Sequence, residues 1–220
     1  MTAPTNPFTN IASAAGLDHL SQNKPGENKP GQNRPSQRAA QPIRLLVLDV
    51  DGVLTDGGIF VDDRGAETKR YHVMDGFGLR LWAKLGERHG LHTAVITGRT
   101  SATVLERLAD LNIPHVIQGS KDKLASLDGL LKSLGLSRAQ ACMVADDWPD
   151  LTVMRSVGYA IAVNNAHDVV KAAAHYTTAR SGGSGAVREA IEHLLELRGL
   201  TAEALALYDS SKPSGVPAHA

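Results

Sequence analysis

The chain has 220 residues, of which 42% are hydrophobic, and its 23 basic residues balance its 23 acidic residues. This length suits one well-packed domain with tails, and a formal net charge of zero argues against a general nucleic-acid binder, which would carry a basic excess. No run approaches the roughly 20 apolar residues of a membrane span, and the first residues lack the basic start and apolar core of a secretory signal. We therefore expect a cytoplasmic protein that binds neither nucleic acid nor membranes.

Residues 1–42 differ in composition from the rest of the chain. Within them, residues 23–37 contain three copies of a degenerate five-residue repeat, each with a proline among polar neighbours. Because this segment has little apolar surface to bury, packing cannot offset its ordering entropy. The sequence predicts a disordered low-complexity tail over 1–42, a folded domain over 43–200 and a C-terminal tail over 201–220.

Short apolar runs after residue 42 have the β-branched and Leu-rich character of buried strands. They occupy residues 43–50, 92–96, 115–117, 142–144 and 159–163. Most are separated by stretches with helical spacing, including 104–111 and 124–134, and Gly135 ends the second of these. The only cysteine, Cys142, excludes an internal disulfide and is predicted to be buried. The alternation implies an α/β fold with a doubly wound, Rossmann-like parallel sheet.

Two regions lie outside this alternation. Residues 59–61 and 68–73 flank a polar turn at 62–65 and predict a β-hairpin that projects from the carboxyl end of the first strand. Near the C-terminus, residues 186–198 predict a long amphipathic helix, and residues 202–208 a further helical turn or two.

Acidic residues gather at the ends of two predicted strands. Asp49 and Asp51 end the first, and Asp146, Asp147 and Asp150 follow the fourth. Open parallel sheets bind ligands at the carboxyl ends of their strands. Carboxylates assembled there would repel one another without a cation and suit a hard ion such as Mg²⁺. An isolated Asp would be read as a helix cap or loop residue, but two clusters at strand ends predict a metal site.

Two further segments complete a candidate phosphate site. Thr97 ends the second main strand, and its hydroxyl and the backbone N–H groups of Gly98 and Arg99 could hold phosphate oxygens. Lys123 opens a helix, where the dipole slightly disfavours a cation unless an anion lies beside it. Lys121 is a nearby alternative that spacing alone does not exclude.

These segments resemble the motifs of the haloacid dehalogenase superfamily of phosphohydrolases. All four motifs occur in the family's order, as Asp49-Val-Asp51-Gly-Val-Leu-Thr55, Ile96-Thr97-Gly98, Lys123 and Asp146-Asp147-x-x-Asp150. Receiver domains of two-component signalling also combine an acidic pocket with Thr and Lys on an α/β sheet. Their motifs come in a different order, and in this chain Asp51 supplies an acid/base group two residues after the candidate nucleophile, as turnover requires.

The resemblance implies a catalytic role for each motif. Asp49 would attack phosphorus and form an aspartyl-phosphate. Asp51 would protonate the leaving alkoxide and later deprotonate the hydrolytic water. Mg²⁺ would be held by Asp49, the backbone carbonyl of Asp51 and Asp146.

The remaining motif residues would support this centre. By the same resemblance, Thr97 and Lys123 would stabilise the charged phosphoryl group. Asp147 and Asp150 would support the metal ligands without binding the metal themselves.

A separate cap domain does not fit at either usual insertion point, because 45 residues separate Asp51 from Thr97 and 22 separate Lys123 from Asp146. The layout resembles the capless, tetrameric family of 3-deoxy-D-manno-octulosonate 8-phosphate phosphatases. The resemblance covers roughly residues 43–200 and rests on the segments 49–57, 75–78, 96–99, 118–119 and 182–189.

This family resemblance implies a homotetramer joined through its hairpins, with the C-terminal tail near an adjoining active site. Arg99 would contact the carboxylate of the sugar acid, and Gly98 and Gly76 would lie against the substrate, although the segment around Gly76 could equally be a simple turn before a helix. Ala145 departs from the family, which usually has glycine there, but it removes no ligand.

The sequence thus predicts Mg²⁺-dependent hydrolysis of 3-deoxy-D-manno-octulosonate 8-phosphate in lipopolysaccharide precursor biosynthesis. The alternatives are a phosphatase for another sugar or nonulosonate phosphate, and a catalytically idle module that only drives oligomerisation. The intact motif set argues against the idle module, because scaffolding requires none of these residues.

Overall fold

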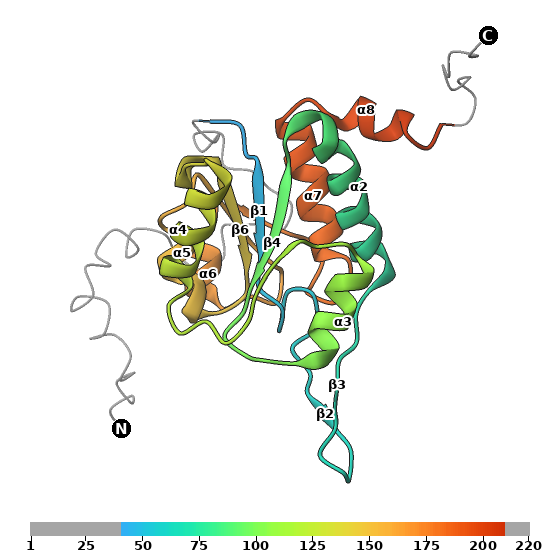
Figure 1. Cartoon of the computed structure of the whole chain (residues 1–220), viewed down its shortest axis with the longest axis vertical. Helices are drawn as coiled ribbons and strands as arrows, with labels where there is room; N and C mark the ends of the chain where they lie inside the picture. The colour runs from blue at the N-terminus through green and yellow to red at the C-terminus, as the bar shows by residue number, and fades with distance from the viewer. Residues whose placement is uncertain (1–40, 210–220) are drawn as a thin grey trace, which may run out of the picture.

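Parallel strands form the central sheet of the computed structural model, which describes residues 41–209 (Figure 1). The strand order is β5-β4-β1-β6-β7-β8, and every neighbouring pair in this sheet is parallel. The strands are β1 (Leu45–Leu48), β4 (His92–Ile96), β5 (His115–Ile117), β6 (Ala141–Ala145), β7 (Tyr159–Ala162) and β8 (Tyr176–Thr177). The predicted repeat at 23–37 and most of both predicted tails lie outside the described residues.

Helices cover both faces of the sheet, with α4, α5 and α6 on one side and α2, α3 and α7 on the other (Figure 1). The α-helices are α2 (Val73–His89), α3 (Ala102–Asp110), α4 (Lys123–Leu134), α5 (Leu151–Met154), α6 (Asp168–Ala173), α7 (Ala186–Leu197) and α8 (Thr201–Ala206), with 3₁₀ turns η3 (Arg138–Gln140) and η4 (Trp148–Asp150). The doubly wound fold predicted from the alternating pattern is confirmed. Within the described residues, no helix is both long and apolar enough to cross a membrane.

The strand order reverses at β1, because the chain passes to β4 and β5 on one side and later to β6, β7 and β8 on the other. In the register, Leu48 pairs with both Val95 and Val144. The residues that follow β1, β4 and β6 therefore emerge side by side at one edge of the sheet. A crevice at such a reversal is where open α/β sheets bind ligands.

Local sequence signals account for the ends of the two helices that flank this edge. In α4, the side chain of Asp122 accepts a hydrogen bond from the N–H of Ala125, and Gly135 ends the helix with φ +63°. In α2, the side chain of His72 caps the first turn, and Gly90 ends the helix with φ +60°. Gly135 therefore has the predicted role.

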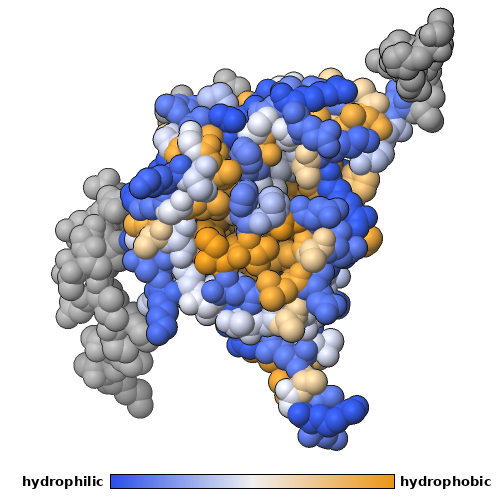
Figure 2. Space-filling view, viewed as in Figure 1, coloured by the Kyte–Doolittle hydropathy of each residue, from blue (hydrophilic) through white to orange (hydrophobic). Residues whose placement is uncertain are grey.

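The predicted hairpin is present but shorter than expected. Strands β2 (Phe60–Val61) and β3 (Glu67–Thr68) pair antiparallel, and the hairpin forms an arm with a hydrophilic tip (Figure 2). The prediction that its second strand runs over 68–73 is wrong, because Val73 already begins α2. No cap domain occurs among the described residues between β1 and β4, where only the hairpin and α2 stand.

Asp75 lies in the first turn of α2 and joins this helix to α7. The residue is 2% exposed, and its carboxylate accepts hydrogen bonds from the N–H groups of Gly185 and Arg188, at the start of α7. A negative charge at a helix N-terminus is favourable. The interpretation of 75–78 as a turn before a helix is therefore wrong: these residues form the first turns of α2, and they join it to α7.

The helix predicted over 186–198 is confirmed as α7, and the helical turns predicted over 202–208 as α8. The prediction omitted α5, α6 and β8, which are short and carry little periodic signal. Cys142 is fully buried, as predicted.

Candidate active site

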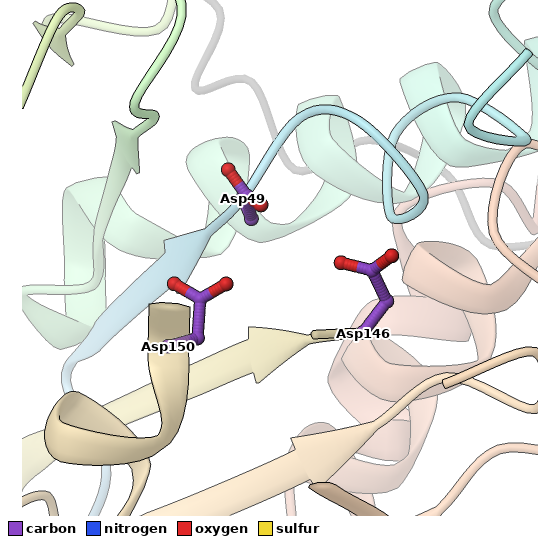
Figure 3. Close-up of side chains that lie close together, drawn as sticks. All are labelled: Asp49, Asp146 and Asp150. Atoms are coloured by element: carbon purple, nitrogen blue, oxygen red, sulfur yellow. The ribbon is translucent and has the colours of Figure 1, made fainter. Parts of the chain in front are cut away.

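A cluster of three carboxylates occupies the carboxyl edge of the sheet (Figure 3). Asp49 directly follows β1, Asp146 directly follows β6, and Asp150 ends the 3₁₀ turn η4. One oxygen from each lies within 4.8 Å of the others. Figure 3 shows the three side chains close together, and the parallel register of β1 and β6 brings Asp49 next to Asp146.

This crowding changes the ionisation of the carboxyl groups. Burial, followed by the charges of Asp49 and Asp147, raises the pKa of Asp146 to about 7. Burial and the charge of Asp49 likewise raise the pKa of Asp150 to about 7, although Lys123 opposes the shift. The protein therefore concentrates negative charge where water cannot fully solvate it, and a cation would relieve this cost.

Lys123 supplies part of the opposing charge. Its Nζ lies 2.7 Å from Asp150 Oδ1 and 3.1 Å from Asp49 Oδ1, and the residue is 8% exposed. Burial acts to lower its pKa, but Asp150 and Asp49 together raise it, so Lys123 remains an ammonium. Lys121 is exposed, so of the two lysines that spacing left open, the structure brings Lys123 to the carboxylates, and its catalytic role stays a prediction.

Buried oxygens in the cluster remain without hydrogen-bond donors. Asp146 Oδ1 and Asp150 Oδ2 are both buried in this way. Buried polar atoms in native proteins almost always have a partner. Together with the all-oxygen donor set, these atoms fit a hard divalent cation such as Mg²⁺.

A second charged group lies beside the carboxylate cluster, at the base of the hairpin. Lys69 Nζ donates a hydrogen bond to Asp51 Oδ1 and lies 2.8 Å from Glu67 Oε1. Arg99 Nη2 lies 2.5 Å from Glu67 Oε2, and Arg99 Nε lies 3.7 Å from Asp51 Oδ2. We call these four residues the hairpin-base network. Sequence reasoning found Asp51 and Arg99 but missed Glu67, which lies just before the predicted strand over 68–73, and Lys69, which lies on it.

Thr97, Gly98 and Arg99 follow β4, beside the end of β1. Thr97 is 4% exposed, whereas Gly98 is exposed at the surface. This placement suits the predicted phosphate contacts. Asp147 is exposed at the start of η4, and its supporting role stays a prediction.

Gly76 is buried in α2, where an added Cβ would lie 2.6 Å from Arg107 Nη2 and 3.2 Å from Leu111 Cδ2. Packing of α2 against α3 thus explains the glycine, and its predicted contact with substrate stays a prediction. Ala145 lies fully buried at the end of β6.

Gly52 is essential to the geometry of the cluster. It has φ +84°, and a Cβ built on it would lie 1.9 Å from Asp146 Oδ2. The neighbouring loop is equally close, because a Cβ on Gly182 would lie 1.8 Å from the carbonyl oxygen of Gly52. Asn165 joins the two, donating to the Gly52 carbonyl and accepting from the Gly182 N–H. The glycine-rich segment at 182–185 therefore packs tightly behind the site.

We expect Gly52→Ala to displace Asp146 and to destabilise the protein by about 2–5 kcal/mol, since left-handed strain and overpacking add. Gly65→Ala is the matched control, because Gly65 has φ +80° with nothing within 4 Å of its Cβ position. Thermal unfolding of both variants separates the clash from the backbone strain. Equal losses of stability would show that contact with Asp146 contributes nothing.

Comparison with known proteins agrees with these motifs. A family model described as haloacid dehalogenase-like hydrolase matches residues 111–191. The chain is 41% identical over 165 residues to the 3-deoxy-D-manno-octulosonate 8-phosphate phosphatase KdsC of Escherichia coli (strain K12), covering 75% of this chain and 86% of that protein.

Solved structures of similar enzymes share the fold. The 3-deoxy-D-manno-octulosonate 8-phosphate phosphatase of Moraxella catarrhalis, in complex with magnesium ion, phosphate ion and a KDO molecule, is 39% identical, with a TM-score of 0.73 over 79% of this chain and 97% of that chain. The enzyme of the same name from Yersinia pestis is 39% identical, with a TM-score of 0.71 over 76% and 87%. The chain therefore belongs to the haloacid dehalogenase-like hydrolases, in the family of 3-deoxy-D-manno-octulosonate 8-phosphate phosphatases.

Proposed function

We propose that this protein hydrolyses 3-deoxy-D-manno-octulosonate 8-phosphate to the free sugar acid and phosphate, with Mg²⁺ as cofactor. The observation that carries the proposal is the convergence of Asp49, Asp146, Asp150 and Lys123 at one sheet edge. The relatives bearing that activity in their names support the choice of substrate.

In the first step, an oxygen of the Asp49 carboxylate attacks phosphorus, and the bond from phosphorus to the ester oxygen breaks. The Asp51 carboxyl gives its proton to the departing alkoxide, so the sugar acid leaves neutral at that oxygen. In the second step, Asp51 takes a proton from water as that water attacks the aspartyl-phosphate, which releases phosphate and restores Asp49. Asp51 returns to its starting protonation state.

The other site residues stabilise the negative charge of the phosphoryl group. Asp49, the Asp51 carbonyl and Asp146 would hold Mg²⁺, which would supply Lewis-acid stabilisation of the phosphoryl oxygens. Lys123 and Thr97 stabilise the same group from the α4 and β4 side. Asp150 fixes Lys123 through the 2.7 Å contact.

Arg99 gives the site its preference for a sugar acid. Its side chain is 49% exposed and lies beside Asp51. A forked guanidinium pairs well with a carboxylate. The carboxylate of the substrate would bind to this guanidinium.

The test is phosphate release from a panel of sugar phosphates, including the octulosonate ester, with Mg²⁺ and with chelator. We expect a higher kcat/KM for the octulosonate ester and loss of turnover on chelation. Metal-dependent preference for another ester would keep the mechanism and overturn the substrate. No turnover of any ester by folded, Mg²⁺-loaded protein would favour the idle module.

We further propose that the protein is a cytoplasmic homotetramer in lipopolysaccharide precursor biosynthesis. Ile59, Phe60 and Val61 on the hairpin are 53%, 56% and 62% exposed, which suits a surface that another subunit covers. Sedimentation of the wild type and of Phe60→Ser tests the assembly, and an unchanged tetramer in the variant would remove Phe60 from the interface.

Stability should depend on pH and Mg²⁺ together. In the metal-free protein, Asp146 and Asp150 have pKa values of about 7, against 3.8 in an unfolded chain. The folded state therefore binds more protons between roughly pH 4 and 7, and its stability falls as the pH rises through this window. Mg²⁺ requires the ionised carboxylates, so the increase in Tm on adding Mg²⁺ should be larger at pH 8 than at pH 5.5. A pH-independent increase would contradict this.

A further inference from the structure

Lys69, at the base of the hairpin, has no part in the reaction steps above. It follows β3 directly, and its side chain is 1% exposed. The residues on either side, Thr68 and Arg70, are both exposed. The alternation of the strand therefore turns Lys69 inward, away from the solvent that surrounds the arm.

Burying an ammonium is costly unless it is paired, because its hydration is lost. Lys69 meets this cost with two carboxylates, as its Nζ donates to Asp51 Oδ1 and lies 2.8 Å from Glu67 Oε1. The neighbouring Arg70 differs, because its side chain is exposed and pairs with Asp56 at 2.6 Å near the surface. The ammonium of Lys69 is thus buried in contact with the Asp51 carboxylate.

The contact with Lys69 determines how Asp51 is oriented. The only other cation at this carboxylate in the hairpin-base network is Arg99, whose Nε lies 3.7 Å from Oδ2, beyond hydrogen-bond distance. Glu67 holds Lys69 on one oxygen and Arg99, at 2.5 Å, on the other. The network therefore aligns Asp51 through Lys69, with Glu67 behind it.

We propose that Lys69 is a positioning residue that holds the Asp51 carboxyl where it can transfer its proton to the leaving oxygen of the ester. The inference rests on the proposed function, because it takes the role of Asp51 as given. Proton transfer requires the donor within hydrogen-bond reach of the departing oxygen, and a misplacement of about 1 Å can cost about 10²-fold in rate.

The test compares two leaving groups. A sugar alkoxide needs the proton from Asp51 in order to leave, whereas p-nitrophenolate leaves readily without one. We expect Lys69→Met to lower kcat/KM for the octulosonate ester by about 10²-fold and that for p-nitrophenyl phosphate by about threefold or less. The parameter kcat/KM is used because it reports the step in which the ester bond breaks. Lys69→Arg should recover much of the loss with the alkyl ester, since it restores a buried cation.

Arg70→Met is the matched control, because it removes the neighbouring cation of the same arm and should leave both esters unaffected. Equal losses with both esters in Lys69→Met would show a merely structural role and overturn the proposal, as would no loss with either. If Lys69→Met does not fold, Lys69→Gln applies the same comparison, with a smaller selective loss expected. If the wild type does not hydrolyse the octulosonate ester, the comparison uses another alkyl phosphate that it does hydrolyse. Failure of the proposed substrate then remains distinct from failure of this inference.

Discussion

Asp49→Asn is expected to lower kcat by at least about 10⁴-fold, because the amide oxygen is too weak a nucleophile to form the aspartyl-phosphate. The substitution keeps the shape of the side chain and removes one negative charge from a crowded cluster. Lys123 keeps its 2.7 Å contact with Asp150, so the fold and the assembly should survive. Phosphate release, measured alongside sedimentation and thermal unfolding, checks the expectation.

Asp56→Asn is the matched control for Asp49→Asn. Asp56 lies in the loop after β1 but is exposed and pairs with Arg70 at 2.6 Å. It should change turnover little. Loss of assembly with unchanged turnover in Asp49→Asn would contradict the catalytic assignment and support a scaffolding role.

Lys123→Met is expected to produce the second largest effect, in two measurements at once. Removing a preorganised cation from the phosphoryl group should lower kcat/KM by about 10²–10³-fold. In the metal-free protein it also leaves Asp49 and Asp150 without their buried partner, which should cost about 3–5 kcal/mol of stability. The stability loss should be smaller at pH 5.5 than at pH 8, because carboxyls with raised pKa take up protons at the lower pH.

Lys121→Met serves as the control, since this lysine lies two residues earlier and is exposed. Kinetics with saturating Mg²⁺ and urea unfolding with chelator separate the two effects of Lys123→Met. Similar losses in both variants would mean that the burial of Lys123 has no functional consequence.

The sheet and the carboxylate cluster could be predicted because their signals are local. β1 is a continuous apolar run that is buried on both faces, and its first catalytic candidate, Asp49, directly follows it. Parallel strands bring their ends to one edge, so the approach of Asp146 to Asp49 follows from topology alone. Gly135 ended its helix as expected because a left-handed C-cap is a local backbone requirement.

Other features depended on contacts between distant segments and could not be predicted in this way. Lys69 is an ordinary polar residue in sequence, and only the fold of the hairpin against the sheet edge buries it beside Asp51. Asp75 read as part of a turn because its partners, the N–H groups of Gly185 and Arg188, come about 110 residues later. The roles of glycines 52 and 182 likewise follow from close tertiary approach.

The bond between Asp75 and the start of α7 has a consequence for how the protein is made. While the ribosome has synthesised only the first four-fifths of the domain, Asp75 and the face of α2 around Gly78 have no α7 to pack against. The central strand β1 must also wait for β6 before both of its edges are paired. A nascent chain of this protein therefore exposes apolar surface until late in translation, and native closure comes only after residue 188 leaves the exit tunnel.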